Sequence, residues 1–179
     1  MIRSCFTLAL SAVLSLLVGN RLVAAPELKA GDKAPLFKAK NQAGEVFDLA
    51  GRGGKGWTVL YFYPKAETPG CTKQACAFRD RVEAIRGAGA EVYGISADTV
   101  AEQHVFHDKH GLRFDLIADP DGAIISAYGA AAMNGKQAKR WTFLLDDKLV
   151  IRWVEHDVDP LLDAQRIEAK IKALKAGKM

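Results

Sequence analysis

A strand–turn–helix signal constrains the fold of this chain more than any other feature. The run Trp57 to Tyr63 is apolar, aromatic and β-branched, which is typical of a buried strand. Pro64 ends it, and Thr68-Pro69-Gly70 predicts a turn into a helix that carries Cys71 and Cys76. Cys71 is therefore expected in a first helical turn, where unpaired N–H groups and the positive end of the helix dipole favour a thiolate, the nucleophilic form of cysteine.

The spacing of Cys71 and Cys76 favours redox chemistry over a structural disulfide. Two helical residues five positions apart have Cα atoms about 8.6 Å apart, beyond the roughly 7 Å that a disulfide spans without backbone movement. A bond between them therefore requires local unwinding of the helix. This suits a redox cycle that alternates between two conformations better than a permanent cross-link.

The remaining pattern predicts alternating strands and helices in one domain. With 179 residues, 49% of them hydrophobic, the chain is long enough for a single core and short for two. The expected elements are strands at 45–49, 57–63, 91–96 and 114–118, helices at 71–86, 98–110 and 123–128, a surface loop at 51–56, a hairpin at 141–145 and 149–154, and a last helix at 160–175.

This order of elements predicts the fold class. A β-α-β-α succession argues for parallel strands with helices on both faces, and the hairpin adds antiparallel strands to the same sheet. Strand–helix–strand followed by a hairpin and a final helix is the thioredoxin-like order. The predicted class is α/β, with a central mixed sheet flanked by helices.

The residues around Cys71 resemble the active-site loop of the peroxiredoxins. The family pattern of Pro, Thr and Cys at fixed spacing is present as Pro64, Thr68 and Cys71. The fuller T-P-G-C-T-x-Q-A-C, with Cys76 five positions on, is similar to the bacterioferritin comigratory protein (peroxiredoxin Q) subfamily. Arg140-Trp141-Thr142-Phe143 matches the family's R-x-T-F and nominates Arg140.

The resemblance implies a catalytic role for each of these residues. Peroxide cleavage by a thiolate develops negative charge on the leaving oxygen, so donors must be fixed where that charge appears. Thr68 would supply a hydroxyl, Arg140 a permanent cation with several N–H donors, and Pro64 would shield the sulfur from bulk water. Taken singly, each also has a structural reading: Pro64 as a strand end, Thr68 as a helix cap and Arg140 as a solvated side chain.

The same resemblance implies a reaction cycle and its partners. Cys71 (peroxidatic) would attack hydrogen peroxide or an organic hydroperoxide to give a sulfenic acid, and Cys76 (resolving) would condense with it to a disulfide. Thioredoxin or a similar dithiol would reduce the disulfide, with no metal or organic cofactor. A buried, inert Cys76 is the alternative, and the protein would then be a one-cysteine peroxidase.

A second function class stays open on the sequence alone. An exported thioredoxin-like carrier of copper or of thiol–disulfide equivalents also uses two cysteines, although its expected spacings are C-x3-C or C-x2-C and this chain has C-x4-C. His104, His107 and His110 form H-x2-H-x2-H on a predicted helix. The first and last differ by about 120° around the helix axis, so the pattern favours polar surface positions over a metal site.

The first 25 residues resemble a secretory signal peptide. Arg3 precedes an uncharged apolar run from Phe6 to Val18, and small residues follow at Ala24-Ala25. We expect export to the periplasm or beyond, cleavage near residue 25, and a thioredoxin-like peroxiredoxin domain over residues 26–179. An uncleaved anchoring segment is the alternative.

The charge balance bears on the expected partners. Removal of Arg3 and Arg21 with this segment lowers the net charge from +4 to +2, with no acidic residue lost. A balance this small, without a Lys/Arg stripe, gives no support for nucleic acid as a partner. We expect no stable membrane partner, and a monomer or weak dimer.

Overall fold

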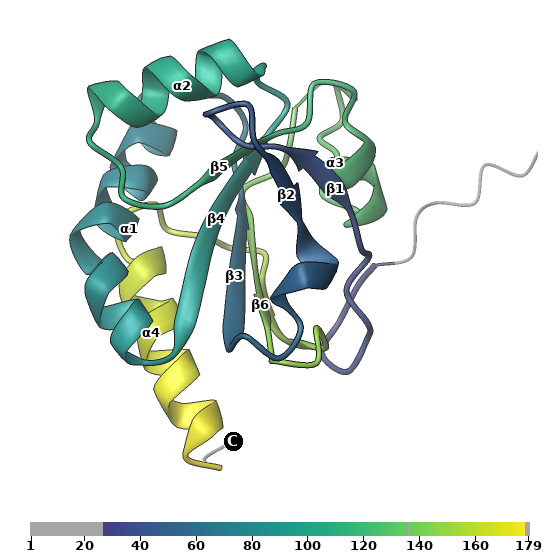
Figure 1. Ribbon diagram of the computed structural model, residues 1–179, viewed down its shortest axis with the longest axis vertical. Coiled ribbons are helices and arrows are strands. Elements are labelled where there is room, and N and C mark those ends of the chain that lie inside the picture. Colours follow the sequence, from purple (N-terminus) through teal and green to yellow (C-terminus); the bar gives the residue numbers. More distant parts are fainter. Residues whose placement is uncertain (1–26, 136, 178–179) are drawn as a thin grey trace, which may run out of the picture.

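The computed structural model describes residues 27–135 and 137–177, and in this part of the chain five strands form one mixed sheet (Figure 1). The strand order is β5-β4-β3-β6-β7, in which β3, β4 and β5 run parallel while β6 and β7 are antiparallel. This confirms the predicted class. The strands are β3 (Trp57–Phe62), β4 (Ala90–Ser96), β5 (Leu116–Ala118), β6 (Trp141–Leu145) and β7 (Ile151–Glu155).

Strand β3 is the centre of the sheet because it is paired along both edges and buried on both faces. Its side chains alternate between two cores, as the pleat requires. Val59 and Tyr61 join one hydrophobic cluster, and Leu60 and Phe62 join the other. Tyr61 lies opposite Gly94 of β4, where an added Cβ would be 2.6 Å from the tyrosine Oη. The absence of a side chain at position 94 therefore makes room for the Tyr61 ring.

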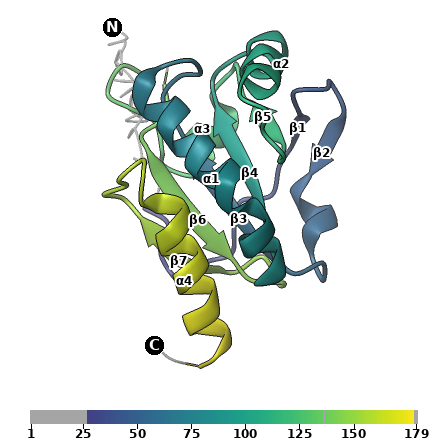
Figure 2. The ribbon, with the colours of Figure 1, turned by 90° about the vertical axis from the view of Figure 1, so that its left-hand side faces the viewer.

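Helices cover the Tyr61 face of the sheet. These are α1 (Pro69–Gly87), α2 (Val100–Lys109) and α4 (Asp163–Lys175), and Figure 2 shows α1 and α4 in front of the strands. They contribute Phe78, Phe106 and Ile167 to the core on that side. This arrangement brings the start of α4 toward the first turns of α1.

The opposite face is covered by shorter elements. These are α3 (Ala123–Ala127), the 3₁₀ turn η1 (Leu49–Arg52) and a two-stranded ribbon of β1 (Lys38–Lys40) and β2 (Val46–Asp48). Leu49 and Ile124 are their buried contributions to the second core. The two faces together form the helix-flanked sheet that the pattern predicted.

The predicted elements are all present, with shifted ends and two additions. Helix α1 begins at Pro69 rather than Cys71, and β5 and α4 are shorter than predicted. Strand β1 was not predicted because Lys-Ala-Lys on an outer ribbon carries no apolar run. The predicted loop at 51–56 begins inside η1, whose first turn is capped by the Asp48 side chain, an acceptor for Ala50 N–H.

The expectations for residues 1–25 lie outside the described residues. Within 27–135 and 137–177, the helices are too short or too polar to cross a bilayer. The domain boundary at residue 26 stays a prediction.

Candidate active site

Cys71 lies in the first turn of α1, as predicted. Thr68 is the N-cap residue and Pro69 is the first helical residue, a position where proline costs no hydrogen bond. The Cys71 side chain is only 1% exposed and belongs to the core cluster that contains Tyr61 and Phe78. The sulfur therefore sits at the junction between the helix start and the aromatic core.

Arg140 is the residue that the structure brings to the sulfur. It immediately precedes β6, and its Nη2 lies 3.4 Å from Cys71 Sγ, within donating distance. Its Nη1 donates to Gln74 Oε1 at 2.6 Å. A Cβ on Gly70 would be 3.1 Å from Nη2, so a residue without a side chain lets the guanidinium lie close to the helix start. The structure thus places the nominated Arg140 beside Cys71, and its catalytic role stays a prediction.

Thr68 and Pro64 lie on the loop between β3 and α1. The Thr68 hydroxyl donates to the Lys65 carbonyl oxygen at 2.8 Å and does not cap the helix. Its proton is thus committed within the loop, and this side chain can meet a substrate only as an acceptor. This geometry differs from the donor role expected for Thr68, whose part in catalysis stays a prediction. Pro64 follows the buried Tyr63 and is itself half-buried.

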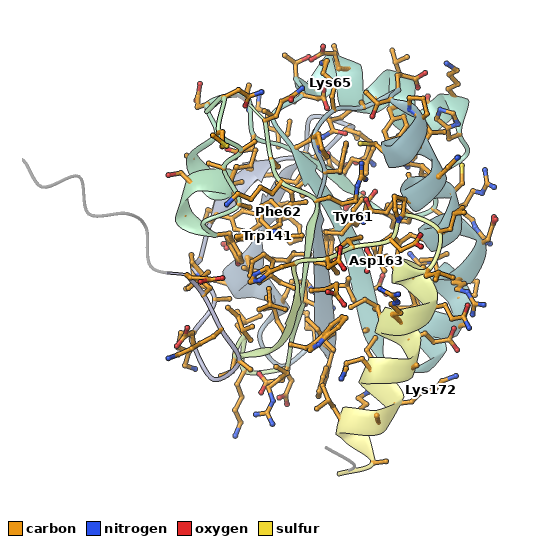
Figure 3. All side chains as sticks on the ribbon, turned by 180° about the vertical axis from the view of Figure 1, so that it is seen from behind. Tyr61, Phe62, Lys65, Trp141, Asp163 and Lys172 are labelled. Carbon is orange, nitrogen blue, oxygen red and sulfur yellow. The ribbon has the colours of Figure 1, made fainter. Side chains whose placement is uncertain are left out.

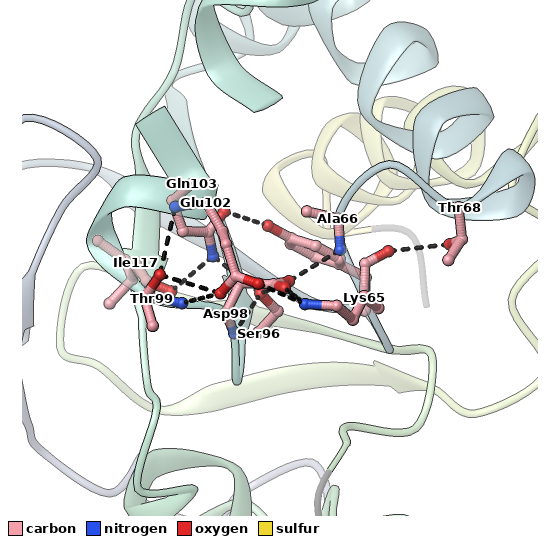
Figure 4. A network of polar contacts seen from close by, with 10 residues as sticks. Lys65, Ala66, Thr68, Ser96, Asp98, Thr99, Glu102, Gln103 and Ile117 are labelled. Atoms are coloured by element: carbon pink, nitrogen blue, oxygen red, sulfur yellow. Dashed lines mark hydrogen bonds and ion pairs between the residues drawn. The ribbon is translucent and has the colours of Figure 1, made fainter. Parts of the chain in front are cut away.

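Asp98, which is buried, anchors the loop through a network of polar contacts (Figure 4). The sequence analysis did not identify this residue as part of the site. Its carboxylate accepts the backbone N–H of Ala66 at 2.8 Å and the Ser96 hydroxyl at 2.7 Å, and it pairs with Lys65. Glu102 of α2 accepts a second bond from Lys65 at 2.8 Å. The turn before the helix is therefore fixed to β4 and α2.

Glu67 is held by the end of α2. Its backbone has φ of +64°, a left-handed conformation that is uncommon for a non-glycine residue. Its carboxylate pairs with Lys109 and lies 3.1 Å from His110 Nε2. The hydrogen bond from Lys109 is the main cause of its lowered pKa. The sequence analysis placed His110 in a histidine pattern but gave it no partner.

The other two histidines of this pattern point to an acid of their own helix. His107 Nδ1 lies 3.0 Å from Asp108, and His104 Nε2 lies 3.5 Å from the same carboxylate. Within residues 27–135 and 137–177, no group of three or more His, Cys, Asp or Glu side chains is arranged to hold a metal ion.

A buried carboxylate, that of Asp163, lies behind Gln74 in the site. Asp163 is the first residue of α4 (Figure 3). It is 1% exposed. Its Oδ2 accepts from Gln74 Nε2 and from the Thr142 hydroxyl, each at 2.7 Å. Oδ1 is buried without a hydrogen-bond partner in the described structure. Burial raises the pKa of Asp163 to about 6, against the lowering effect of the two hydrogen bonds.

This pKa predicts an unusual pH dependence of stability. Because the folded-state pKa is higher than the unfolded value, the native state binds the proton more tightly, and this contribution to stability grows as pH falls from about 6 to about 4. Relative to Asp163→Asn, the wild-type free energy of unfolding should gain about 2 kcal/mol between pH 7 and pH 4. Urea unfolding at both pH values measures it. A difference between the two proteins that does not change with pH would contradict the prediction.

Gln74 and Asp163 were missed by the sequence analysis. Gln74 is three residues after Cys71 on the same helix, so helical spacing could have placed it near the sulfur. For Asp163 no comparable signal exists, because its partners are 89 and 21 residues away in the chain.

Cys76 lies in the same continuous helix as Cys71, and both are free thiols. Cys76 is half-buried and borders a surface depression of about 440 Å³ that also includes Lys73 and Leu161. Because both residues are helical, a bond between them requires that this part of α1 unwind.

Comparison with known proteins agrees with this geometry. The AhpC/TSA family model matches residues 30–154. Peroxiredoxin Q of Triticum aestivum chloroplasts is 43% identical over 125 residues, which cover 69% of this chain and 57% of the wheat protein. The solved structure of peroxidoxin BcpB from Mycobacterium tuberculosis is similar with a TM-score of 0.77 and 32% identity, covering 82% of this chain and 98% of that one.

A third relative belongs to the same group. The Xanthomonas campestris bacterioferritin comigratory protein, solved in a study of its alkyl peroxide reduction activity, has a TM-score of 0.72 and 31% identity. The match covers 77% of this chain and 91% of the X. campestris chain. These relatives and the family match over most of the described residues agree. The chain therefore belongs to the AhpC/TSA family and is a thiol-dependent peroxidase of the bacterioferritin comigratory protein (peroxiredoxin Q) group.

Proposed function

We propose that Cys71 is the sulfur that reduces the peroxide. The observation that carries this is the Arg140 guanidinium, 3.4 Å from a sulfur in the first turn of a helix. The Cys71 thiolate attacks one peroxide oxygen, the O–O bond breaks, and a sulfenic acid forms. The departing oxygen takes up a proton and leaves as water or an alcohol. Arg140 and the helix N-terminus provide positive charge where the leaving oxygen becomes negative.

Thr68 supports this reaction as an acceptor. Its hydroxyl donates to the Lys65 carbonyl, so its oxygen can accept a hydrogen bond from the O–H of a hydroperoxide and orient the O–O bond. Pro64, between the buried Tyr63 and the loop, would keep bulk water from the sulfur. The fixed loop keeps both residues in place before substrate arrives.

Cys76 is proposed as the resolving cysteine. Its sulfur attacks the Cys71 sulfenic acid, an S–S bond forms and water leaves. The first turns of α1 unwind to allow this. A dithiol protein, thioredoxin or one similar to it, then reduces the disulfide and is itself oxidised. The half-buried position of Cys76 beside a surface depression supports such access.

Hydrogen peroxide and organic hydroperoxides are the proposed substrates. Support for the organic class comes from the X. campestris relative, whose structure was solved to explain alkyl peroxide reduction. The chemistry at Cys71 needs only the O–O bond, so both classes can react at the same sulfur.

A titration of the reduced protein tests the proposed function. One equivalent of hydrogen peroxide should remove two thiols per chain within seconds, with the peroxide consumed. A thioredoxin-like copper or thiol carrier would instead bind Cu(I) and leave the peroxide unconsumed. Unchanged thiol content after peroxide addition would overturn the proposal.

Export is proposed on the sequence pattern of residues 1–25. If the segment is a signal peptide, N-terminal sequencing of protein from the periplasmic or secreted fraction should begin near residue 26. Recovery in the cytoplasmic fraction with Met1 retained would contradict this.

We also propose a monomer or weak dimer. Light scattering across a concentration series measures it, and a stable assembly at low micromolar concentration would contradict it.

A further inference from the structure

We propose that Asp163 is a positioning residue of the peroxidase reaction, which fixes the orientation of Gln74 and through it holds the Arg140 guanidinium against Cys71. This rests on the proposed role of Cys71. The contacts form one continuous chain: Arg140 Nη2 lies 3.4 Å from the sulfur, Arg140 Nη1 lies 2.6 Å from Gln74 Oε1, and Gln74 Nε2 lies 2.7 Å from Asp163 Oδ2.

The direction of this chain follows from the donor and acceptor capacity of its members. An arginine side chain can only donate, and an ionised carboxylate can only accept. The amide of Gln74 lies between them and has one group of each kind. A charged Asp163 binds the amide NH₂, and the amide oxygen is then directed at Arg140. Gln74 is itself fully buried, so no solvent competes for its amide.

The charge of Asp163 strengthens this arrangement, because a hydrogen bond to an ionised acceptor is about twice as strong as a neutral one. When Asp163 is protonated it keeps an acceptor oxygen for the Gln74 amide, but that hydrogen bond is then neutral and holds the amide less firmly. Arg140 is then held less firmly, although it is not released. The rate of peroxide attack should therefore fall as Asp163 takes up a proton.

Several groups face Asp163 from the elements around it. The hydrogen bonds from Thr142 of β6 and Gln74 of α1 lower its pKa, and so does the charge of Arg166 in α4. The charge of Glu155 in β7 raises it. Tyr61 of β3 is close enough that the Asp163 charge raises the tyrosine pKa. Burial outweighs the lowering effects, and the carboxyl titrates at about pH 6.

The test is the rate of Cys71 oxidation by hydrogen peroxide, measured by stopped flow from pH 5 to pH 8 in wild type and Asp163→Asn. The variant is isosteric and keeps an acceptor oxygen for Gln74, so it should fold, and its melting temperature checks this. The ratio of wild-type to variant rate cancels the ionisation that the two proteins share. We expect a ratio of about three to ten at pH 8, falling to about one at pH 5, with a midpoint near 6.

Further variants sharpen the measurement. Thr142→Val removes a hydrogen bond that lowers the Asp163 pKa. The ratio of the Thr142→Val rate to the rate of the double variant Thr142→Val/Asp163→Asn should therefore have its midpoint at a higher pH than the wild-type ratio. Asp163→Ala removes the acceptor as well as the charge and should be slower at every pH, by about tenfold or more. Asp157→Asn is the matched control, because this exposed residue lies on the loop before α4, and it should reproduce the wild-type profile.

The outcome separates this inference from the proposed function. If wild type does not react with peroxide through Cys71, the proposed function fails. If wild type reacts but the ratio of wild type to Asp163→Asn is the same at every pH, Asp163 has a structural role only and the inference is wrong. An Asp163→Ala rate within twofold of wild type would also overturn it.

Discussion

A Cys71→Ser protein is expected to lose peroxidase turnover by more than about 1,000-fold, because no other group in the site can take the place of the attacking sulfur. A serine hydroxyl at neutral pH is not a comparable nucleophile. Peroxide consumption with a dithiol reductant in excess measures the loss. The substitution is nearly isosteric at a buried position, so thermal unfolding should show a folded protein.

Cys76→Ser is the matched variant and should behave differently. It keeps Cys71 beside Arg140, so it should consume the first equivalent of peroxide at close to the wild-type rate and then stop at the sulfenic acid. Comparison of the first turnover with the second distinguishes the two cysteines. If both variants lose the first turnover equally, the proposed division of roles is wrong.

Replacement of Arg140 by methionine should lower the second-order rate constant with hydrogen peroxide by about 100- to 1,000-fold, the effect of removing one preorganised donor from an oxyanion site. Methionine retains much of the length of the side chain but provides neither charge nor N–H groups. Single-turnover stopped flow measures the attack on the peroxide separately from resolution by Cys76.

Arg140→Lys tests why the guanidinium is required. Lysine keeps the charge, but its single ammonium cannot match the fork that donates to Gln74 and Cys71 from two different nitrogens. It should recover only part of the rate. Arg152→Met, on β7, changes the net charge equally and serves as the control. A rate for Arg140→Met within threefold of wild type would show that the guanidinium does not stabilise the reaction.

The residues that could be predicted are those with a local signal. Strand β3, the turn at Thr68 and the helix with Cys71 follow each other in one stretch of sequence. The hydrophobic pattern and the proline and glycine residues therefore define them directly. Arg140 was found differently. It is 69 residues from Cys71, and only the resemblance of its R-x-T-F segment to a family pattern linked the two.

Two of the residues that were missed, Asp98 and Asp163, act through contacts that no local pattern encodes. Asp98 anchors Ala66 from 32 residues away, and Asp163 meets Gln74 from 89 residues away. Each is an aspartate next to a helix start, a place where aspartate is common for capping alone. Their burial, which gives them a role in the site, follows from the packing of α2 and α4 on the sheet.

The same packing explains a cost that the site imposes on the fold. Burial of Asp163 disfavours its ionised form, as its raised pKa shows, so the charge that orients Gln74 at neutral pH is maintained against the stability of the protein. A preorganised active site often carries such a local cost. Here the expected signature, relative to Asp163→Asn, is a stability that increases in mild acid while the peroxidase rate decreases.

The most direct measurement is the location of the oxidised sulfur. Cys76→Ser protein, reduced and then treated with one equivalent of hydrogen peroxide in the presence of dimedone, should carry one adduct on the peptide that contains Cys71. Cys71→Ser protein treated in the same way should carry none. An adduct on Cys76 in the Cys71→Ser protein, formed at a rate comparable to that of the other variant, would show that Cys71 is not the sulfur that this site activates.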